Sequence, residues 1–409
     1  MTARHLLDMH NINELGQVFT QPPVVQAMLA LRRNSWGRVL EPACGNGAFS
    51  SHLPGCTAIE LDPAHAPEGS LQMDFFTLPT SERFATIIGN PPYVRYQDVT
   101  PKTKALLNTN DLNQRANLYL FFIEKCLRHL EPGGELIFIT PRDFMKTTGS
   151  VRLNQRLAAE GSITDAIELG DAKIFEGALP NCLIWRYEKD RVESGMRYAE
   201  IGARDRLAEA LAHPRWQSRR FEESHGHLVF AETTHALKLL DVAGVKVGAV
   251  SGADAIFSDP ALANREFVCA HTVKTGRTRK MLWLDGNDKP PSPLLAHKKR
   301  LLARRVIRFD ESNWWCWGRS YPNNDGPRVY VNGKTRVKRP FFVHPCQHYD
   351  GAVLAIFPHN RKVQPEVLRD ALNLVDWNRS GYVCDGRFLF SQRSLENAPI
   401  PAQFEQFLP

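Results

Sequence analysis

The chain has 409 residues, of which 43% are hydrophobic and 23% are charged, as is usual for folded globular proteins. These values exclude a disordered, collagen-like or coiled-coil protein, and the length predicts two to three domains. No run approaches the roughly 18 apolar residues that a membrane span needs, and the N-terminus lacks the apolar core of a secretory signal. We therefore expect a soluble, cytoplasmic protein without a membrane partner.

The formal net charge of +7 is unevenly distributed along the chain. Residues 1–210 carry a net charge of −3, whereas residues 211–409 carry +10 and the stretch 265–339 alone carries +12. Aromatic residues are interleaved with the basic ones in that stretch, a pattern typical of nucleic-acid binding. The composition predicts a first part that does chemistry and a second part that binds a polyanion, although a solvated basic face would give the same composition.

The first half alternates apolar strand-like runs with helical patterns. Strands are expected, in chain order, over residues 38–42, 56–61, 84–89, 135–140, 163–169 and 183–187, with a helix over 118–130. This alternation predicts an α/β fold with a doubly wound, mostly parallel sheet. Ligands of such sheets bind beyond the carboxyl ends of the strands.

The second half has a different pattern. Residues 188–225 are charged and predict a helix-rich connector, and short strands separated by Gly, Pro and Asn turns follow from about residue 226. We therefore expect a first domain over residues 1–220 and a basic α+β domain over residues 221–409.

Three motifs at predicted strand ends suit a nucleoside-like ligand with a cationic amino-acid part. The first is Glu41-Pro42-Ala43-Cys44-Gly45-Asn46-Gly47, in which glycines let the backbone approach a ligand and a carboxylate disfavours a pyrophosphate. Glu60 can accept hydrogen bonds from ribose hydroxyls, and Asp74-Phe75 can accept from an adenine amino group and cover its ring. Each acid alone is as well explained by a surface or turn position.

The fourth motif, Gly89-Asn90-Pro91-Pro92-Tyr93, is the most informative. The Asn90 amide and the Pro91 carbonyl both offer an acceptor oxygen, and consecutive prolines fix the backbone. A planar NH₂ group that donates one hydrogen to each oxygen has its nitrogen lone pair drawn out of conjugation and becomes nucleophilic. Tyr93 is placed to stack on the base that carries this group.

Together these motifs resemble the class I S-adenosylmethionine-dependent methyltransferases, specifically the gamma-class, TaqI-like DNA adenine-N6 methyltransferases of restriction–modification systems. The resemblance covers about residues 14–187 and includes Gly16-Gln-Val-Phe-Thr20-Gln-Pro-Pro, which is similar to the family's N-terminal motif. It implies S-adenosyl-L-methionine as the cofactor, bound by Thr20, Glu41, Ala43, Cys44, Gly45, Glu60, Asp74, Phe75, Asn90 and Pro92. The implied catalytic residues are Asn90, Pro91, Pro92, Tyr93 and Phe175. Cys44 is expected to pack rather than to act as a nucleophile, and no metal is expected.

The same resemblance implies a monomeric bacterial enzyme that flips an adenine out of double-stranded DNA and transfers the methyl group directly. A cognate restriction endonuclease would act as a separate protein. The basic second domain would contact the DNA, and its candidate residues are Arg277, Arg279, Lys280, Arg304, Arg305 and Arg308.

Several alternatives remain open from the sequence. The same chemistry could act on RNA, on a protein glutamine or on cytosine N4, although Ser is more usual than Asn90 in cytosine-N4 enzymes. A non-catalytic DNA-binding specificity protein would not need the cofactor motifs. His344, Cys346 and His348 alternate along one predicted strand, but they lack a second ligand pair at zinc-finger spacing, so ordinary strand residues are the favoured interpretation.

Overall fold

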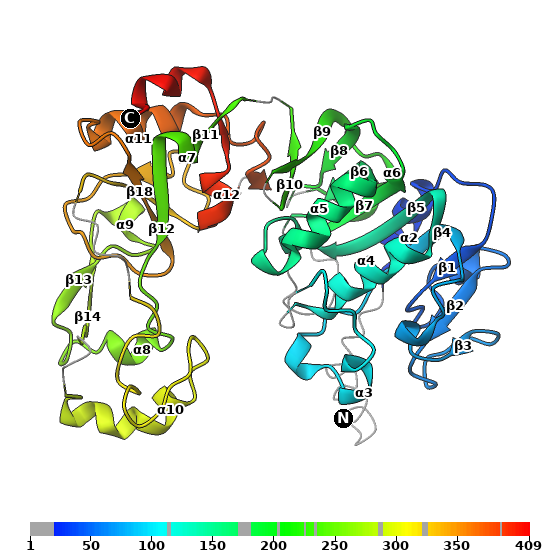
Figure 1. The fold of residues 1–409 in the computed structure, drawn as a ribbon, viewed down its shortest axis with the longest axis horizontal. Coiled ribbons are helices and arrows are strands. Elements are labelled where there is room, and N and C mark those ends of the chain that lie inside the picture. The colour runs from blue at the N-terminus through cyan, green and yellow to red at the C-terminus, as the bar shows by residue number, and fades with distance from the viewer. Residues whose placement is uncertain are drawn as a thin grey trace. The chain divides into compact units, whose positions relative to one another are not determined.

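A computed structural model of the chain describes residues 20–112, 116–170, 181–202, 205–224, 226–232, 235–284, 289–320, 326–384 and 387–409. The chain divides into two compact units, Met1–Glu232 and Thr233–Pro409 (Figure 1). Within the described residues, no helix is long and apolar enough to cross a membrane.

In the described part of the first unit, ten strands form one sheet in the order β10-β9-β8-β6-β7-β5-β4-β1-β2-β3. Their bounds are β1 Val39–Glu41, β2 Thr57–Glu60, β3 Leu71–Gln72, β4 Phe84–Gly89, β5 Leu130–Pro141, β6 Gly161–Glu168, β7 Cys182–Lys189, β8 Gly195–Glu200, β9 Gln217–Ser224 and β10 His227–Ala231. Strands β3, β2, β1, β4 and β5 run parallel to one another, and β7 runs antiparallel between β5 and β6. The predicted α/β class with a mostly parallel sheet is confirmed.

Helices cover both faces of this sheet, so the unit has three layers. The helices are α2 Pro22–Ala30, α3 Pro101–Lys104, α4 Leu118–His129, α5 Val151–Glu160 and α6 Leu207–Ala212. Side chains alternate across the strands, so that Ile87 of β4 packs in the core under α4 and α5, whereas Ile88 packs under α2 and α6. Both faces of the central strands are buried, which explains why their sequences read as continuous apolar runs.

The prediction of a helix-rich connector over residues 188–225 is wrong. This region contributes β8 and β9 to the sheet, with the short α6 between them. The few apolar side chains, such as Met196, Tyr198 and Phe221, are buried, but they stand among charged residues that hide the strand alternation. Because β9 and β10 continue the first sheet, the first unit extends to Glu232 rather than to residue 220.

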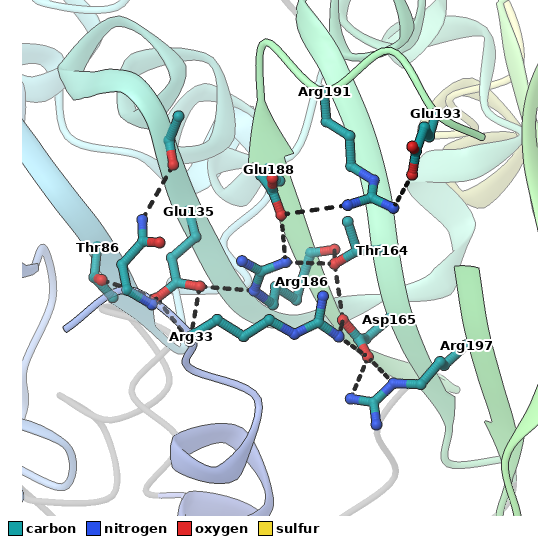
Figure 2. Close-up of polar contacts among 12 residues, drawn as sticks. Arg33, Thr86, Glu135, Thr164, Asp165, Arg186, Glu188, Arg191, Glu193 and Arg197 are labelled. Atoms are coloured by element: carbon teal, nitrogen blue, oxygen red, sulfur yellow. Dashed lines mark hydrogen bonds and ion pairs between the residues drawn. The ribbon is translucent and has the colours of Figure 1, made fainter. Parts of the chain in front are cut away.

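A buried polar network crosses the strands of the first unit at the level of Thr86 in β4 and Glu135 in β5 (Figure 2). Glu135 accepts from Nε of Arg186 at 2.7 Å and from Oγ1 of Thr86 at 2.9 Å. Its carboxylate also accepts from the backbone N–H of Arg33, which follows α2. Because a buried carboxylate needs such partners, the network ties the chain just after α2 to β4, β5 and β7.

In the described part of the second unit, the largest sheet has four antiparallel strands in the order β12-β18-β15-β17. The strands of this unit are β11 Leu237–Lys238, β12 Ala243–Val247, β13 Arg265–Phe267, β14 Arg279–Met281, β15 Val329–Asn332, β16 Lys334–Thr335, β17 Phe341–Phe342, β18 Val353–Pro358, β19 Val383–Cys384, β20 Arg387–Leu389 and β21 Pro399–Ile400. The helices are α7 Leu239–Val242, α8 Asp254–Phe257, α9 Thr272–Thr275, α10 Lys298–Leu302, α11 Pro365–Leu374 and α12 Gln392–Glu396. One core packs α11 and α12 on the four-stranded sheet, and a separate aromatic core gathers Phe257, Phe267, Trp314 and Trp317.

Candidate active site

The predicted motifs meet at the carboxyl ends of neighbouring parallel strands in the first sheet. Strand β1 has β2 on one side and β4 on the other, so the chain reverses its direction of progress across the sheet at β1, and such a switch point leaves a crevice beyond the strand ends. Glu41 and Glu60 are the last residues of β1 and β2, and Asp74 and Asn90 follow the ends of β3 and β4. Four motifs that are distant in sequence therefore lie side by side.

A pocket of about 1100 Å³, including the part open to solvent, lies at these strand ends. The predicted residues that line it are Thr20, Glu41, Ala43, Cys44, Gly45, Glu60, Asp74, Phe75, Asn90, Pro91, Pro92 and Tyr93. The last predicted member, Phe175, falls outside the described residues and stays a prediction.

Glu41 lines the pocket and is 1% exposed. Its Oε2 accepts from the backbone N–H of Ser50 at 2.7 Å. Burial raises the pKa of this carboxyl to about 7, although hydrogen bonding with Ser50 lowers the pKa in part. A cationic group in the pocket would favour the ionised form, so Glu41 suits an ammonium ligand better than an anion.

Glu60 orients the loop that follows β1. Its two carboxylate oxygens accept from the backbone N–H groups of Gly45, at 2.7 Å, and of Asp62, at 2.8 Å. Gly45 has a φ of 51°, a left-handed conformation that glycine adopts without a steric penalty. Burial raises the pKa of the neighbouring Cys44 thiol to about 12, so the thiol stays protonated at neutral pH and fits the packing role expected for it.

Asp74 begins the 3₁₀ turn Phe75–Thr77 and caps it. Its Oδ1 accepts from the backbone N–H of Phe76 at 3.0 Å, and its Oδ2 accepts from Oγ1 of Thr103 at 2.7 Å. The Phe75 ring lines the pocket and stacks on Phe122 of α4, with ring centroids 5.1 Å apart and planes at 26°. This corner of the pocket thus has a carboxylate beside a flat aromatic wall.

The Asn90–Tyr93 motif is held from both of its ends. Nδ2 of Asn90 donates to Oγ1 of Thr20 at 3.2 Å, which determines which end of the amide faces Thr20. The Tyr93 hydroxyl donates to the carbonyl of Ile139 at 2.9 Å. The Tyr93 and Tyr119 rings form a T-shaped pair with centroids 5.8 Å apart. This hydrogen bond of its hydroxyl fixes the partly buried Tyr93 ring beside the pocket.

The pocket also has walls beyond the residues predicted to contact a ligand. They are Pro42 and Asn46 of the first motif, together with Ala48, Phe49, Leu61, Met73, Phe76, Val94, Asp98, Val99, Thr100, Thr103, Leu118 and Phe122. Phe122 lies in α4, which is apolar over most of its circumference and largely buried, so periodicity could not mark one position as a ligand wall. Thr100 and Thr103 follow the Asn90–Tyr93 motif at no spacing that points to a ligand.

The six basic residues proposed for DNA contact have three different surroundings. Arg277, Lys280, Arg305 and Arg308 are exposed. Arg279 is half-buried and forms ion pairs with Asp254 at 3.2 Å and Asp350 at 3.0 Å.

The expected DNA contact of Arg304 needs correction, because its side chain belongs to the interior. Arg304 is 8% exposed, and its guanidinium donates to the backbone carbonyls of Ser251, Trp314 and Cys316. The Phe309 ring centroid lies 3.8 Å from its Cζ. A guanidinium enclosed in this way organises the fold of residues 265–339, which we call the basic lobe, and does not reach a phosphate.

Among the described residues, no group of three or more His, Cys, Asp or Glu side chains is placed to hold a metal ion. In the suggested histidine–cysteine cluster, Nδ1 of His344 accepts from the backbone N–H of Cys346 at 3.0 Å. The Cys346 thiol donates to the Glu266 carbonyl at 3.3 Å.

Comparison with known proteins relates the first unit to one group of enzymes. Residues 59–175 match the family described as Eco57I restriction-modification methylase. Type II methyltransferase M.HincII of Haemophilus influenzae is 32% identical over 189 residues, which span 43% of this chain and 38% of that protein. Type II methyltransferase M.TthHB8I of Thermus thermophilus is 34% identical over 200 residues, which span 43% of this chain and 45% of that protein.

The alignments therefore cover less than half the length of either curated relative. Among solved structures, the type IIL restriction–modification enzyme MmeI, solved in complex with DNA, has a TM-score of 0.58 at 16% identity, and the match covers 88% of this chain and 62% of that chain. This match shows a shared fold. The chain thus shares a fold with MmeI and is similar in sequence, over less than half of its length, to type II methyltransferases.

Proposed function

We propose that the protein is a site-specific DNA methyltransferase that transfers a methyl group from S-adenosylmethionine to N6 of adenine in double-stranded DNA. One observation carries the proposal: the Asn90–Tyr93 motif opens into the same pocket as Glu41, Glu60 and Asp74. The similarity to type II methyltransferases supports it over the same part of the chain.

The pocket residues fit the proposed cofactor by the chemistry of their groups. Glu41 offers a carboxylate to an ammonium, Glu60 to a ribose diol and Asp74 to an adenine amino group, and aromatic and aliphatic side chains form the remaining walls. When bound, this cofactor supplies a methyl group on a positively charged sulfur, and the rest of the cofactor leaves readily as a neutral thioether.

Asn90 and the carbonyl of Pro91 would hold the amine that is to be methylated. Because Nδ2 of Asn90 donates to Thr20, the amide oxygen is the end that we assign to the substrate amine. Two acceptors that each take one amine hydrogen raise the electron density on nitrogen, and fixed dipoles of this kind contribute without reorganising during reaction. No strong base is required, because the proton can leave to solvent after the transfer.

An adenine inside a duplex cannot reach this pocket, so we infer that the base is flipped out, at a cost of a few kcal/mol. Stacking on an aromatic ring contributes about 1–3 kcal/mol per base, and Tyr93 is the ring we assign to this contact. The hydrogen bond from its hydroxyl to the Ile139 carbonyl holds the ring before the base arrives, which reduces the entropy lost on binding. Phe175 would support the other face of the base.

The second unit would bind the DNA through its exposed basic side chains. Arg277, Lys280, Arg305 and Arg308 lie on the surface of the stretch with a net charge of +12, and phosphate contacts by such residues position a protein on a duplex. This excess charge favours a nucleic acid over a protein glutamine as substrate. We further propose a monomer on DNA and a cognate endonuclease that acts separately.

Expression in a methylation-free bacterial host, followed by single-molecule sequencing of the genomic DNA, tests the function. We expect N6-methyladenine at one short sequence, and no such mark with the Asn90→Ala variant. N4-methylcytosine at a defined sequence would replace adenine as the target, and unmodified DNA from a host with folded, cofactor-binding protein would contradict DNA methylation.

A further inference from the structure

Three of the acids that line the pocket, Glu41, Glu60 and Asp74, are not held in the same way. Glu41 and Glu60 accept from groups of the loops directly around them, namely backbone N–H groups and, for Glu41, also the side chain of Ser50. Asp74 accepts from one backbone N–H and, in addition, from the hydroxyl of Thr103, which comes from a helix 29 residues away in the chain. We propose that Thr103 is a positioning residue that aims the Asp74 carboxylate and thereby sets the selectivity of the pocket for a purine with a 6-amino group. This inference rests on the proposed function, in which Asp74 accepts from the adenine of the cofactor.

The contacts around Asp74 define the orientation of its carboxylate. Oγ1 of Thr103 donates to Oδ2 at 2.7 Å, and the N–H of Phe76 donates to Oδ1 at 3.0 Å. One donor on each oxygen fixes the plane of the carboxylate. Thr103 is 7% exposed and lines the pocket itself, so its hydroxyl is sheltered from competing water.

The Thr103 hydroxyl is itself the second link of a chain of hydroxyl groups. Oγ1 of Thr100 donates to Oγ1 of Thr103 at 3.2 Å, and Oγ1 of Thr100 accepts from the backbone N–H of Thr103 at 3.2 Å. With its acceptor side engaged by Thr100, the Thr103 hydroxyl directs its own hydrogen to Asp74. Hydrogen bonds in such chains polarise and strengthen one another.

An aimed carboxylate discriminates between purines more strongly than a rotating one. An ionised carboxylate has about four lone-pair sites, so the two donors from the chain leave room on each oxygen for an amino group of the ligand. A ligand with hydrogen in place of the 6-amino group would cover this carboxylate without donating to it, and an unsatisfied charged acceptor is costly. If the carboxylate could turn away, that cost would largely disappear.

The link also joins two parts of the site. Thr103 belongs to α3, which follows the Asn90–Tyr93 motif after a short turn, and Asp98, Val99 and Thr100 of the intervening segment line the same pocket. One hydrogen bond therefore connects the residue assigned to the adenine of the cofactor with the segment that continues from the residues assigned to the target base.

The test compares two ligands on a set of full-length variants by isothermal titration calorimetry. The ligands are S-adenosyl-L-homocysteine and its analogue with hydrogen in place of the 6-amino group. For the natural protein we expect the analogue to bind about 10- to 100-fold more weakly, the range for a hydrogen bond to a charged group. Thr103→Val keeps the shape and removes the hydroxyl, and we expect the ratio of the two dissociation constants to fall below about fivefold.

Two further variants bracket that result. Thr103→Ser restores the hydroxyl and should restore a ratio close to that of the natural protein, and Asp74→Asn should lose most of the ratio. Thermal unfolding is recorded for each variant, and Thr103→Ala replaces Thr103→Val if the latter does not unfold in a single transition. A merely structural role for Thr103 would weaken both ligands equally and leave the ratio unchanged, which would overturn the inference.

Failure of the proposed function would look different. If the natural protein binds neither ligand, the cofactor assignment itself is wrong. If it binds both ligands equally well, Asp74 does not read the amino group, and the inference about Thr103 is overturned while the methyltransferase assignment stands.

Discussion

The pocket of the first unit and the basic lobe of the second unit differ in how well the sequence predicts where a side chain lies. In the pocket, Glu41, Glu60, Asp74 and Asn90 were singled out as separate motifs and line one cavity. In the basic lobe, residues chosen for their charge have unrelated surroundings, from the exposed Arg305 to the buried Arg304. The difference arises because parallel strands bring their carboxyl ends to one edge, whereas a charged residue type alone does not say which way its side chain points.

The largest expected effect concerns the pocket. Asn90→Ala should lower methyl transfer to DNA by about 10³-fold or more, since removing one preorganised polar group that acts on the reacting atoms costs about 10²–10³ and the substrate amine also loses its position. Cofactor binding should change by less than about fivefold. Transfer of a radiolabelled methyl group to DNA and calorimetry of cofactor binding measure the two quantities.

Asn110→Ala provides a matched control for Asn90, because Asn110 is exposed and does not line the pocket. This variant should keep normal turnover. Near-normal turnover of Asn90→Ala would refute the role of the motif, and an equal loss in both variants would point to instability instead.

The next effect concerns the basic lobe and is one of stability. Arg304→Met should lower the free energy of unfolding by about 3 kcal/mol, because the carbonyls of Ser251, Trp314 and Cys316 lose their donor inside the lobe. The neighbouring Arg305→Met should change it by less than about 0.5 kcal/mol, as is usual for exposed positions. Urea unfolding followed by tryptophan fluorescence separates the two, and equal effects would contradict the assignment of Arg304 to the interior.

Sequence reasoning therefore succeeded where patterns are tied to backbone geometry. Apolar runs that end in Gly or Pro placed the strands Val39–Glu41 and Phe84–Gly89 within one or two residues, and the motifs followed from those ends. It failed over residues 188–225, where buried apolar residues alternate with charged ones too sparsely to show a strand. It could not find Thr103, because a hydroxyl that aims a carboxylate 29 residues away leaves no local pattern.

A third prediction uses the raised pKa of Glu41. Burial raises it to about 7, and a ligand ammonium requires the ionised form, so binding should strengthen as the pH rises to 7 and then level off. If only the ionised form binds, the dissociation constant of S-adenosyl-L-homocysteine at pH 5.5 should be about 30-fold higher than at pH 8. Glu41→Gln should bind weakly with a flat profile over this range, and an unchanged profile would remove Glu41 as the ammonium ligand.

The same shift predicts the stability of the ligand-free protein. Because the folded pKa of Glu41 lies above the unfolded value of 4.5, its contribution to stability is fully present below about pH 4.5 and is lost as the pH rises through about 7. Glu41→Gln should remove this part of the pH dependence of the melting temperature. Cofactor binding should reverse it, since an ammonium beside the carboxylate favours ionisation.

The smallest expected effect tests whether exposed charge in the lobe acts by contact or by net charge. Each phosphate contact contributes about 0.9 to the slope of log affinity against log salt, so Arg305→Ala with Arg308→Ala should flatten the slope by up to about 1.8. Arg361→Ala with Lys362→Ala removes the same charge from exposed positions outside the basic stretch and should flatten it far less, because surface charges beyond a Debye length are screened. Fluorescence anisotropy of a labelled duplex at several salt concentrations measures both slopes. Equal flattening by the two pairs would mean that the second unit attracts DNA through its overall charge and that composition, rather than the position of Arg305 and Arg308, is what matters there.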